Sequence, residues 1–363
     1  MKKCIGCGIC LQTTISNKPG FTNKLENDYC LRCFRIKNYN DLIDQELDQE
    51  TFIANIKNIV HNDKDPIFYY ILDIFDLEGT RMLEIENLIA NKTVVIVINK
   101  IDLIPKSVKL SKIRKYVTKM FASSKLANAK IILTASDNQK LILPFLNIVL
   151  KSFQNQYFIG ASNVGKSSLI NALMKANNLV PKILESRYFN TTLELIDINL
   201  DSGVKIIDTP GIARNNSIAH IMNQKDWQYC YFKKELRQYT FQLNSEQAMF
   251  FSGLAWFTFI SETKIRQNFH IYVNKEILLH RTKQNNAANY FTKNKELLIT
   301  PTVIDEGQEY HFKFEKSDIG KEFDISISGL GWINFIVQSE QEITFIIPLK
   351  NQKTLISLRE PII

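Results

Sequence analysis

Apolar residues between about residues 45 and 215 fall into short runs separated by longer amphipathic stretches. Short apolar runs predict buried strands at residues 67–72, 93–98, 130–133 and 156–159. Two further strands, 195–200 and 204–207, flank an Asp201-Ser202-Gly203 turn and predict a hairpin. Helical patterns cover residues 79–91, 107–124 and 167–175. This alternation of strands and helices is typical of an α/β sheet.

The pattern changes after about residue 215. Residues 216–363 begin helically and then become strand-like and aromatic. Residues 251–256 (FSGLAW) recur in altered form as residues 327–332 (ISGLGW), and an alternating run follows each copy. The recurrence suggests a duplicated β unit, with a short coincidence as the alternative. The first 40 residues differ again, because they are rich in cysteine and hold too little apolar material for a core.

These changes divide the 363 residues into three predicted domains, 1–42, 43–215 and 216–363. A hydrophobic content of 45% and a charged content of 23% are those of a soluble globular protein. The longest wholly apolar run, residues 94–98, is far shorter than the roughly 20 residues that span a bilayer. Met1-Lys2-Lys3 is followed by cysteines and polar residues, so no secretory signal is expected. We expect a cytoplasmic protein without a membrane partner.

The net charge of +8 and the pI near 9.0 favour a polyanionic partner such as nucleic acid. A composition rich in Lys and Asn that reflects a biased genome is the alternative explanation. Charge alone does not decide between the two.

Residues 160–167 fit the phosphate-loop pattern G-x-x-x-x-G-K-S, between a predicted strand and a predicted helix. In such a loop the glycines let backbone N–H groups surround the phosphates, Lys166 reaches the β- and γ-phosphates, and Ser167 ligates Mg²⁺. The dipole of the following helix also favours an anion there. A chance Gly-Lys-Ser turn is the alternative, which this context disfavours. The expected nucleotide contacts are Gly160, Ala161, Ser162, Asn163, Val164, Gly165, Lys166, Ser167 and Ser168.

About forty residues on, Asp208-Thr209-Pro210-Gly211 ends another apolar strand. Asp208 can hold Mg²⁺ through water, and the Gly211 amide can sense the γ-phosphate. Turns of the Asp-x-x-Gly type are common. The position of this one after the phosphate loop is what indicates a role in nucleotide binding. Between the two motifs, Asn190-Thr191-Thr192-Leu193 offers two threonines that could close over Mg²⁺ and the γ-phosphate. A β-branched surface strand is the alternative for this segment.

Asn99-Lys100-Ile101-Asp102 also ends an apolar strand. A carboxylate at Asp102 can accept hydrogen bonds from N1–H and the 2-amino group of guanine, and adenine has neither donor. An unpaired buried carboxylate costs several kcal/mol, so this motif predicts selection of GTP over ATP. A helix cap at Asp102 is the alternative, which the presence of the phosphate loop outweighs. A compatible second base contact follows the next strand, at Thr134, Ala135 and Ser136.

Ile212 stands after Gly211, where many GTPases place a glutamine that orients water. An aliphatic side chain cannot do this by hydrogen bonding, so catalysis needs a further residue, a partner or a cation. Asn163 in the loop offers an oxygen that could hold K⁺ against the β- and γ-phosphates, which is a hypothesis. The expected catalytic residues are Lys166, Asn163, Thr192 and Gly211.

Five of the six cysteines lie within the first 33 residues. Cytosolic disulfides are rare, so this clustering points to a metal first. Cys4, Cys7, Cys30 and Cys33 form two C-x-x-C pairs that can close a tetrahedral Zn²⁺ site, with redox or buried thiols as alternatives. Cys10 is another possible partner for Cys7. The nearby basic and aromatic residues suit RNA and suit an ordinary solvated face nearly as well: Arg32, Phe34, Arg35, Lys37 and Tyr39.

The nucleotide motifs stand in rotated order, because the Asn-Lys-x-Asp motif precedes the phosphate loop by about sixty residues. In an ordinary GTPase the loop comes first. If the phosphate loop is called G1, Thr191-Thr192 G2, Asp208–Gly211 G3, Asn99–Asp102 G4 and residues 134–136 G5, the order along this chain is G4-G5-G1-G2-G3. This order predicts a circularly permuted α/β P-loop GTPase fold. Asp208–Gly211 then leads directly into residues 216–363, while Asn99–Asp102 is tied to the cysteine region.

With this order and the paired cysteines, the chain resembles the bacterial YqeH GTPases, which are circularly permuted and implicated in assembly of the small ribosomal subunit. The matching segments run nearly end to end: residues 4–7, 30–35, 72–76, 99–105, 160–167, 191–193, 208–212, 241–244 and both Ser-Gly-Leu copies. The resemblance implies a zinc finger, a permuted GTPase core and a β-rich α+β C-terminal domain that binds RNA or protein.

The family's Pro-Gly-Thr-Thr-Leu stretch makes Thr192 the Mg²⁺ ligand, although Phe189-Asn190 replaces Pro-Gly here. The family's hydrophobic residue after Asp-Thr-Pro-Gly matches Ile212, which implies slow intrinsic hydrolysis. Cys10 lies outside the family's ligand pattern. The predicted function is therefore a slow GTPase that uses GTP/GDP, Mg²⁺ and Zn²⁺ and binds rRNA or a pre-30S particle. An RNA-binding assembly factor with a structural nucleotide site and a GTPase of tRNA modification are the alternatives.

Overall fold

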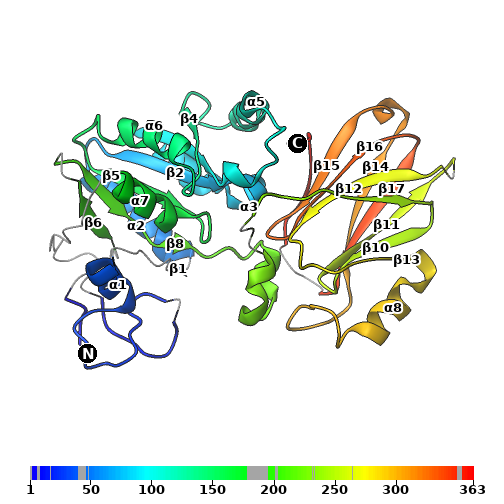
Figure 1. Cartoon of the computed structure of the whole chain (residues 1–363), viewed down its shortest axis with the longest axis horizontal. Coiled ribbons are helices and arrows are strands. Elements are labelled where there is room, and N and C mark those ends of the chain that lie inside the picture. The colour runs from blue at the N-terminus through cyan, green and yellow to red at the C-terminus, as the bar shows by residue number, and fades with distance from the viewer. Residues whose placement is uncertain are drawn as a thin grey trace. The chain divides into compact units, whose positions relative to one another are not determined.

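The computed structural model describes the following residues: 2–5, 9–16, 18–39, 46–47, 49–177, 195–200, 203–230, 232, 234–263, 265–349 and 354–363. They form two compact units (Figure 1). Unit 1 comprises Met1–Asp102 and Lys109–Arg214, and unit 2 comprises Leu103–Val108 and Asn215–Ile363.

Unit 1 is built on a six-stranded sheet in the order β4-β3-β2-β5-β7-β6. Its strands are β2 (Ile67–Asp73), β3 (Thr93–Asn99), β4 (Lys130–Leu133), β5 (Gln156–Gly160), β6 (Ile196–Asn199) and β7 (Lys205–Asp208). All neighbours pair in parallel except β6 and β7, which form the predicted hairpin. Every residue of β2 is buried, as expected for a central strand covered on both faces. The six predicted strands are therefore confirmed.

The helices of unit 1 are α1 (Leu31–Tyr39), α2 (Gln49–Asn62), α3 (Leu77–Thr80), α4 (Leu83–Ile89), α5 (Leu110–Phe121), α6 (Gln139–Val149) and α7 (Lys166–Ala176). Along the sheet, α6 contacts α7, and α2 contacts α4. A separate parallel pair joins β1 (Glu46–Leu47) to β8 (Gly211–Ile212). The sequence patterns did not predict α1, α2 or α6. In α6 the buried residues Ile142, Phe145, Leu146 and Val149 keep helical spacing, and the internal Pro144 is the feature that argues against a helix in the sequence.

The single helix predicted at residues 79–91 is wrong. Arg81 is extended, with φ −74° and ψ 143°, and it separates α3 from α4. The N–H of Met82 donates to the Tyr70 hydroxyl at 2.7 Å instead of to a helical carbonyl. The Tyr70 side chain, from strand β2, thus interrupts the helix. The hydrophobic periodicity of residues 79–91 cannot predict this contact, because Tyr70 lies outside that segment. The helix predicted at residues 107–124 begins later, because Lys109 is also extended.

Unit 2 contains two five-stranded antiparallel sheets, β13-β10-β11-β17-β14 and β18-β15-β16-β12-β9. Their strands are β9 (Tyr239–Leu243), β10 (Gln247–Phe251), β11 (Ala255–Ser261), β12 (Gln267–Val273), β13 (Leu279–Lys283), β14 (Gln308–Phe314), β15 (Glu322–Ile327), β16 (Gly331–Ile336), β17 (Gln341–Ile347) and β18 (Ile356–Arg359). Aromatic rings join the sheets: Phe257 lies 5.1 Å from Phe269, centroid to centroid, and Phe314 lies 5.2 Å from Phe335. The unit is a β-sandwich with one shared core.

One further helix, α8 (Ala287–Asn294), covers part of one sheet, where Phe291 packs on Trp256. The helical start predicted after residue 215 consists of two 3₁₀ segments, Ile218–Ile221 and Gln224–Cys230. Within the described ranges, no helix combines the length and the apolar content that crossing a bilayer requires.

Both copies of the recurring Ser-Gly-Leu segment form β-hairpins. The first lies between β10 and β11, and the second between β15 and β16 in the other sheet. Their turns differ in detail, since Ser252 takes the left-handed conformation in one (φ 51°) and Gly329 in the other (φ 77°). The predicted β unit is therefore present twice, once in each sheet.

Candidate nucleotide and metal sites

The phosphate loop connects β5 to α7, and two of its glycines have no room for a side chain. A Cβ on Gly165, which has φ +85°, would lie 2.5 Å from Asn99 Nδ2, and one on Gly160 would lie 2.6 Å from the Ile71 carbonyl oxygen. Lys166 and Ser167 begin α7 and are both 2% exposed. Ser168, one residue on, is exposed. The loop thus has the strand, turn and helix context that phosphate binding requires.

The Asn-Lys-x-Asp segment lies directly against this loop. Asn99 Nδ2 donates to the Val164 carbonyl at 2.8 Å, and Lys100 Nζ donates to the Asn163 carbonyl at 2.7 Å. The contact arises because β3 and β5 flank β2 and all three strands end at the same edge of the sheet. Two motifs that are distant in the chain therefore share one site.

Asp73, at the end of β2, joins the site and was not among the predicted site residues. Its carboxylate accepts from Lys100 Nζ at 2.5 Å and from the Phe75 N–H at 3.0 Å. Asp76 forms an ion pair with Arg214, which follows Asp208–Gly211 in the chain. Two acidic residues directly after a buried strand are the only sequence signal for this role.

Asp102 follows the end of β3 at this edge and is partly buried. Burial raises the pKa of its carboxyl group, the nearby Asp137 raises it further, and Lys100 opposes both. Thr134 lies close by, since its N–H donates to the Ile98 carbonyl at 2.9 Å and its carbonyl accepts from the Ile101 N–H at 3.2 Å. Thr134 and Ala135 are fully buried, whereas Ser136 is partly exposed. The predicted second base contact therefore lies beside the first.

Asp208 and Gly211 approach the loop from the other side, because β7 is the neighbour of β5. The Ser162 N–H donates to the Ile212 carbonyl at 2.9 Å. A Cβ on Gly211 would lie 2.9 Å from Ser162 Oγ and 3.0 Å from Ser162 Cα, so this close approach requires glycine. Residues 190–193, with the predicted ligand Thr192, lie outside the described residues.

Three buried polar atoms around the loop have no hydrogen-bond partner among the described residues: Asn99 Oδ1, Ser162 Oγ and Asp208 Oδ1. Buried polar atoms are nearly always paired, so an unpaired group calls for an explanation. Asn99 is bonded to the loop at Val164, Ser162 belongs to the loop, and Asp208 lies on β7 beside β5. Together with Lys166 at the start of α7, this donor set fits a phosphate group with Mg²⁺, because it combines a cation, a hydroxyl and a carboxylate.

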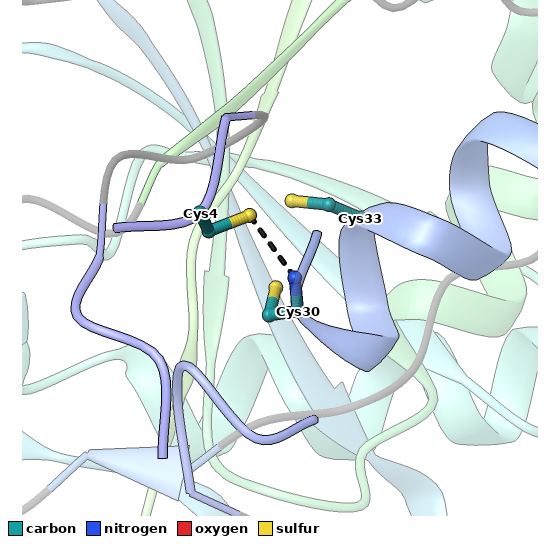
Figure 2. A group of neighbouring side chains, drawn as sticks. All are labelled: Cys4, Cys30 and Cys33. Atoms are coloured by element: carbon teal, nitrogen blue, oxygen red, sulfur yellow. Dashed lines mark hydrogen bonds between the residues drawn. The ribbon is translucent and has the colours of Figure 1, made fainter. Parts of the chain in front are cut away.

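Three of the four predicted zinc ligands come together (Figure 2). The Sγ atoms of Cys4, Cys30 and Cys33 lie within 4.8 Å of one another, and all three side chains are buried. The Cys30 N–H donates to Cys4 Sγ at 3.2 Å. Cys7 lies outside the described residues, and Cys10 is exposed. Three buried sulfurs at this separation form a candidate metal site.

Cys230, the sixth cysteine, is buried in unit 2.

Two family models match the chain. One, described as RsgA GTPase, matches residues 79–217 and therefore includes all the nucleotide motifs. The other, described as YqeH-like, C-terminal, matches residues 266–361 in the β-sandwich. A solved structure, YjeQ from Thermotoga maritima, aligns with 40% of this chain and 48% of its own at 22% identity and a TM-score of 0.29.

Two of the relatives match more than nine tenths of the chain, and a third matches a shorter part. The uncharacterized protein YqeH of Bacillus subtilis is 34% identical over 95% of both chains. NO-associated protein 1, chloroplastic/mitochondrial, of Arabidopsis thaliana is 25% identical over 91% of this chain and 69% of its own. The nuclear GTP-binding protein NUG1 of Saccharomyces cerevisiae is 32% identical over 41% of this chain and 32% of its own. The chain therefore belongs to the YqeH family of circularly permuted GTPases, and it is an enzyme that hydrolyses GTP.

Proposed function

We propose that this GTPase is a nucleotide-dependent switch in assembly of the small ribosomal subunit, where it binds rRNA or a pre-30S particle. The observation that supports the nucleotide site is the 2.8 Å hydrogen bond from Asn99 Nδ2 to the Val164 carbonyl oxygen, which joins the Asn-Lys-x-Asp segment to the phosphate loop. Family membership supports the ribosomal role. The net charge of +8 is consistent with a phosphate-rich partner.

The phosphates are held by the loop and α7 in this proposal. Lys166 neutralises charge on the β- and γ-phosphates, and loop N–H groups donate to them. Ser167 and Thr192 would hold Mg²⁺, whose charge would screen the phosphates. Asp208 would help to hold the ion through Oδ1, which lacks a partner among the described residues. The Gly211 N–H senses the γ-phosphate.

Asp102 selects guanine. Its carboxylate accepts from N1–H and the 2-amino group, and residues 134–136 close the other side of the base. Because burial raises the pKa of this carboxyl group, two donated hydrogen bonds stabilise the ionised form that burial disfavours.

Ile212 accounts for slow hydrolysis in the isolated protein. Its side chain is 3% exposed and cannot orient water, and its carbonyl is already bonded to the Ser162 N–H. Rapid hydrolysis therefore requires a group supplied from elsewhere, such as the ribosomal particle or a cation beside Asn163.

The cysteine cluster binds structural zinc, with Cys7 as the fourth ligand. The division into residues 1–42, 43–215 and 216–363 then assigns one binding module to each end of a GTPase core with motif order G4-G5-G1-G2-G3. Metal analysis of the purified protein should give one zinc ion per chain. A Cys30→Ser variant should lose it, and a metal-free wild-type protein would contradict the assignment.

Sedimentation with purified 30S and 50S subunits tests the ribosomal role. The protein is expected to sediment with 30S subunits in a non-hydrolysable GTP analogue and to remain in the supernatant in GDP. Single-turnover hydrolysis should accelerate when 30S subunits are added. Equal sedimentation in both nucleotides would overturn the switch, and binding to 50S alone would overturn the choice of subunit.

A further inference from the structure

Arg32 connects the cysteine cluster to the nucleotide site. It lies in α1 between Cys30 and Cys33, and its guanidinium forms an ion pair with the Asp208 carboxylate. The pair is buried, with side-chain exposures of 3% for Arg32 and 0% for Asp208. None of the roles proposed above for the cysteine cluster or for Asp208 requires this contact.

A buried ion pair is informative because each charge needs the other. Removing one partner of such a pair typically costs about 3–5 kcal/mol, since the remaining charge is left in a low-dielectric environment. Only another cation can release Arg32 from Asp208 without exposing a bare carboxylate.

Mg²⁺ and its water shell are that cation under the proposed function, on which this inference rests. The Arg32 guanidinium and a hydrated Mg²⁺ would compete for the negative charge of the Asp208 carboxylate. The Arg32 guanidinium and Mg²⁺ would both lie beside one carboxylate and would repel each other. Because Asp208 is buried, little water is present to screen this repulsion. Binding of Mg²⁺ with nucleotide is therefore coupled to departure of Arg32.

The cysteine cluster determines where Arg32 can lie. Two cluster cysteines flank it at short sequence distance, and the Cys30 N–H is bonded to Cys4 Sγ at 3.2 Å. The start of α1 is thereby held to the cluster (Figure 2). A displacement of Arg32 from Asp208 is then transmitted to the cluster, because the arginine backbone has little independent freedom.

We propose that Arg32 is a positioning residue of the GTPase site. It holds Asp208 when Mg²⁺–nucleotide is absent and is displaced when Mg²⁺–GTP binds, so the cysteine cluster is docked on the core in one state and released in the other. Coupling is reciprocal: whatever binds the released cluster also favours Mg²⁺–GTP.

The test compares full-length wild-type protein with Arg32→Ala, Arg32→Lys and the matched control Arg35→Ala, an exposed arginine of the same helix. The apparent affinity for Mg²⁺ is measured by titration in the presence of a fluorescent GDP analogue. Arg32→Ala should tighten it about tenfold, which is an ordinary size for coupling between sites. The apparent Mg²⁺ affinity of Arg32→Lys should lie between those of the wild type and Arg32→Ala. The affinity of Arg35→Ala should match that of the wild type.

A second measurement does not depend on nucleotide affinity. Hydrogen exchange of residues 31–39 should accelerate in the wild type when Mg²⁺ and a non-hydrolysable GTP analogue are added. In Arg32→Ala, exchange should already be fast without them. This wild-type measurement keeps the proposal testable if the alanine variant fails to fold.

Asp208→Asn separates failure of this inference from failure of the proposed function. If that variant leaves Mg²⁺ affinity unchanged, the magnesium role of Asp208 is wrong. If it weakens Mg²⁺ binding while Arg32→Ala has no effect on Mg²⁺ affinity, only the role of Arg32 is overturned. Slower hydrolysis by Arg32→Ala at unchanged Mg²⁺ affinity would also overturn it, and would point to direct contact of the arginine with the phosphates.

Discussion

Asp208 in unit 1 and Asp324 in unit 2 are both fully buried carboxylates beside an arginine, yet their remaining bonds differ. Asp324 accepts from Asn334 Nδ2 at 2.9 Å and from the Ile362 N–H at 3.2 Å, with Arg359 Nε at 3.5 Å. Asp208 Oδ1 has no such partner within the described part of the chain.

The difference separates a structural carboxylate from one that serves a ligand. The Asp324 bonds all come from unit 2, so they are present whenever the sandwich is folded. The unpaired oxygen of Asp208 lies beside the phosphate loop, where nucleotide and Mg²⁺ would complete its bonding. We infer that the buried carboxylate of Asp208 serves a ligand, whereas the buried carboxylate of Asp324 serves the fold of unit 2.

Replacing each of the two aspartates with asparagine is the strongest test of this difference between Asp208 and Asp324. Asp208→Asn is expected to slow hydrolysis by about 100-fold, because the carboxylate that helps to hold Mg²⁺ beside the transferring phosphate is lost. Its melting temperature should also fall, because Arg32 is left buried without its charged partner, so the hydrolysis rate is the measurement that separates the two variants. Asp324→Asn should leave the rate unchanged and alter the melting temperature. Single-turnover hydrolysis and calorimetry on both variants check this, and a reversed pattern would refute it.

The base site offers a second large effect within unit 1. Asp102→Asn is expected to weaken GDP binding by about 100-fold, since the amide cannot accept both donors of guanine. Xanthine nucleotides, which present a complementary edge, should then bind better than guanine nucleotides. Competition between fluorescent GDP and the diphosphates of both bases measures the shift. Unaltered GDP affinity would reject the role of Asp102.

A smaller effect is expected from the acid–base behaviour of unit 2. Burial raises the pKa of Asp324 to about 6, against the opposing effects of Arg359 and Asn334. Because the folded pKa exceeds the unfolded value, this group stabilises the fold at low pH, and that contribution is lost as pH rises through about 6. Unit 2 should therefore lose about 1–3 kcal/mol of stability between about pH 4 and pH 7. Denaturant unfolding of wild type and Asp324→Asn gives the difference, which should vanish if Asp324 stays ionised.

The smallest expected effect concerns the cation hypothesis at Asn163. Replacing Na⁺ with K⁺ should raise the hydrolysis rate several-fold in the wild type and leave Asn163→Ala unaffected. The Asn163 carbonyl already accepts from Lys100 at 2.7 Å, so only its side chain is available for the ion. Equal wild-type rates in both salts would end the hypothesis.

Much of the unit 1 fold could be predicted because its strands are short apolar runs with polar ends. Each of β2 to β7 lies within one or two residues of its predicted bounds. Helix bounds were less predictable, since the break at Arg81 depends on the Tyr70 hydroxyl of a neighbouring strand. In unit 2 the recurring segment predicted a repeated β unit, but not that the two hairpins lie in opposite sheets.

The sequence by itself determined the motifs and their order, because these depend on local chemistry: a glycine where no Cβ fits, a lysine and serine at a helix start, two C-x-x-C pairs. Only the tertiary structure decided which charges meet. Asp73 with Lys100, Asp76 with Arg214 and Arg32 with Asp208 are ion pairs between segments far apart in the chain. No local pattern specifies such partners, since strand order and burial bring them together only after folding.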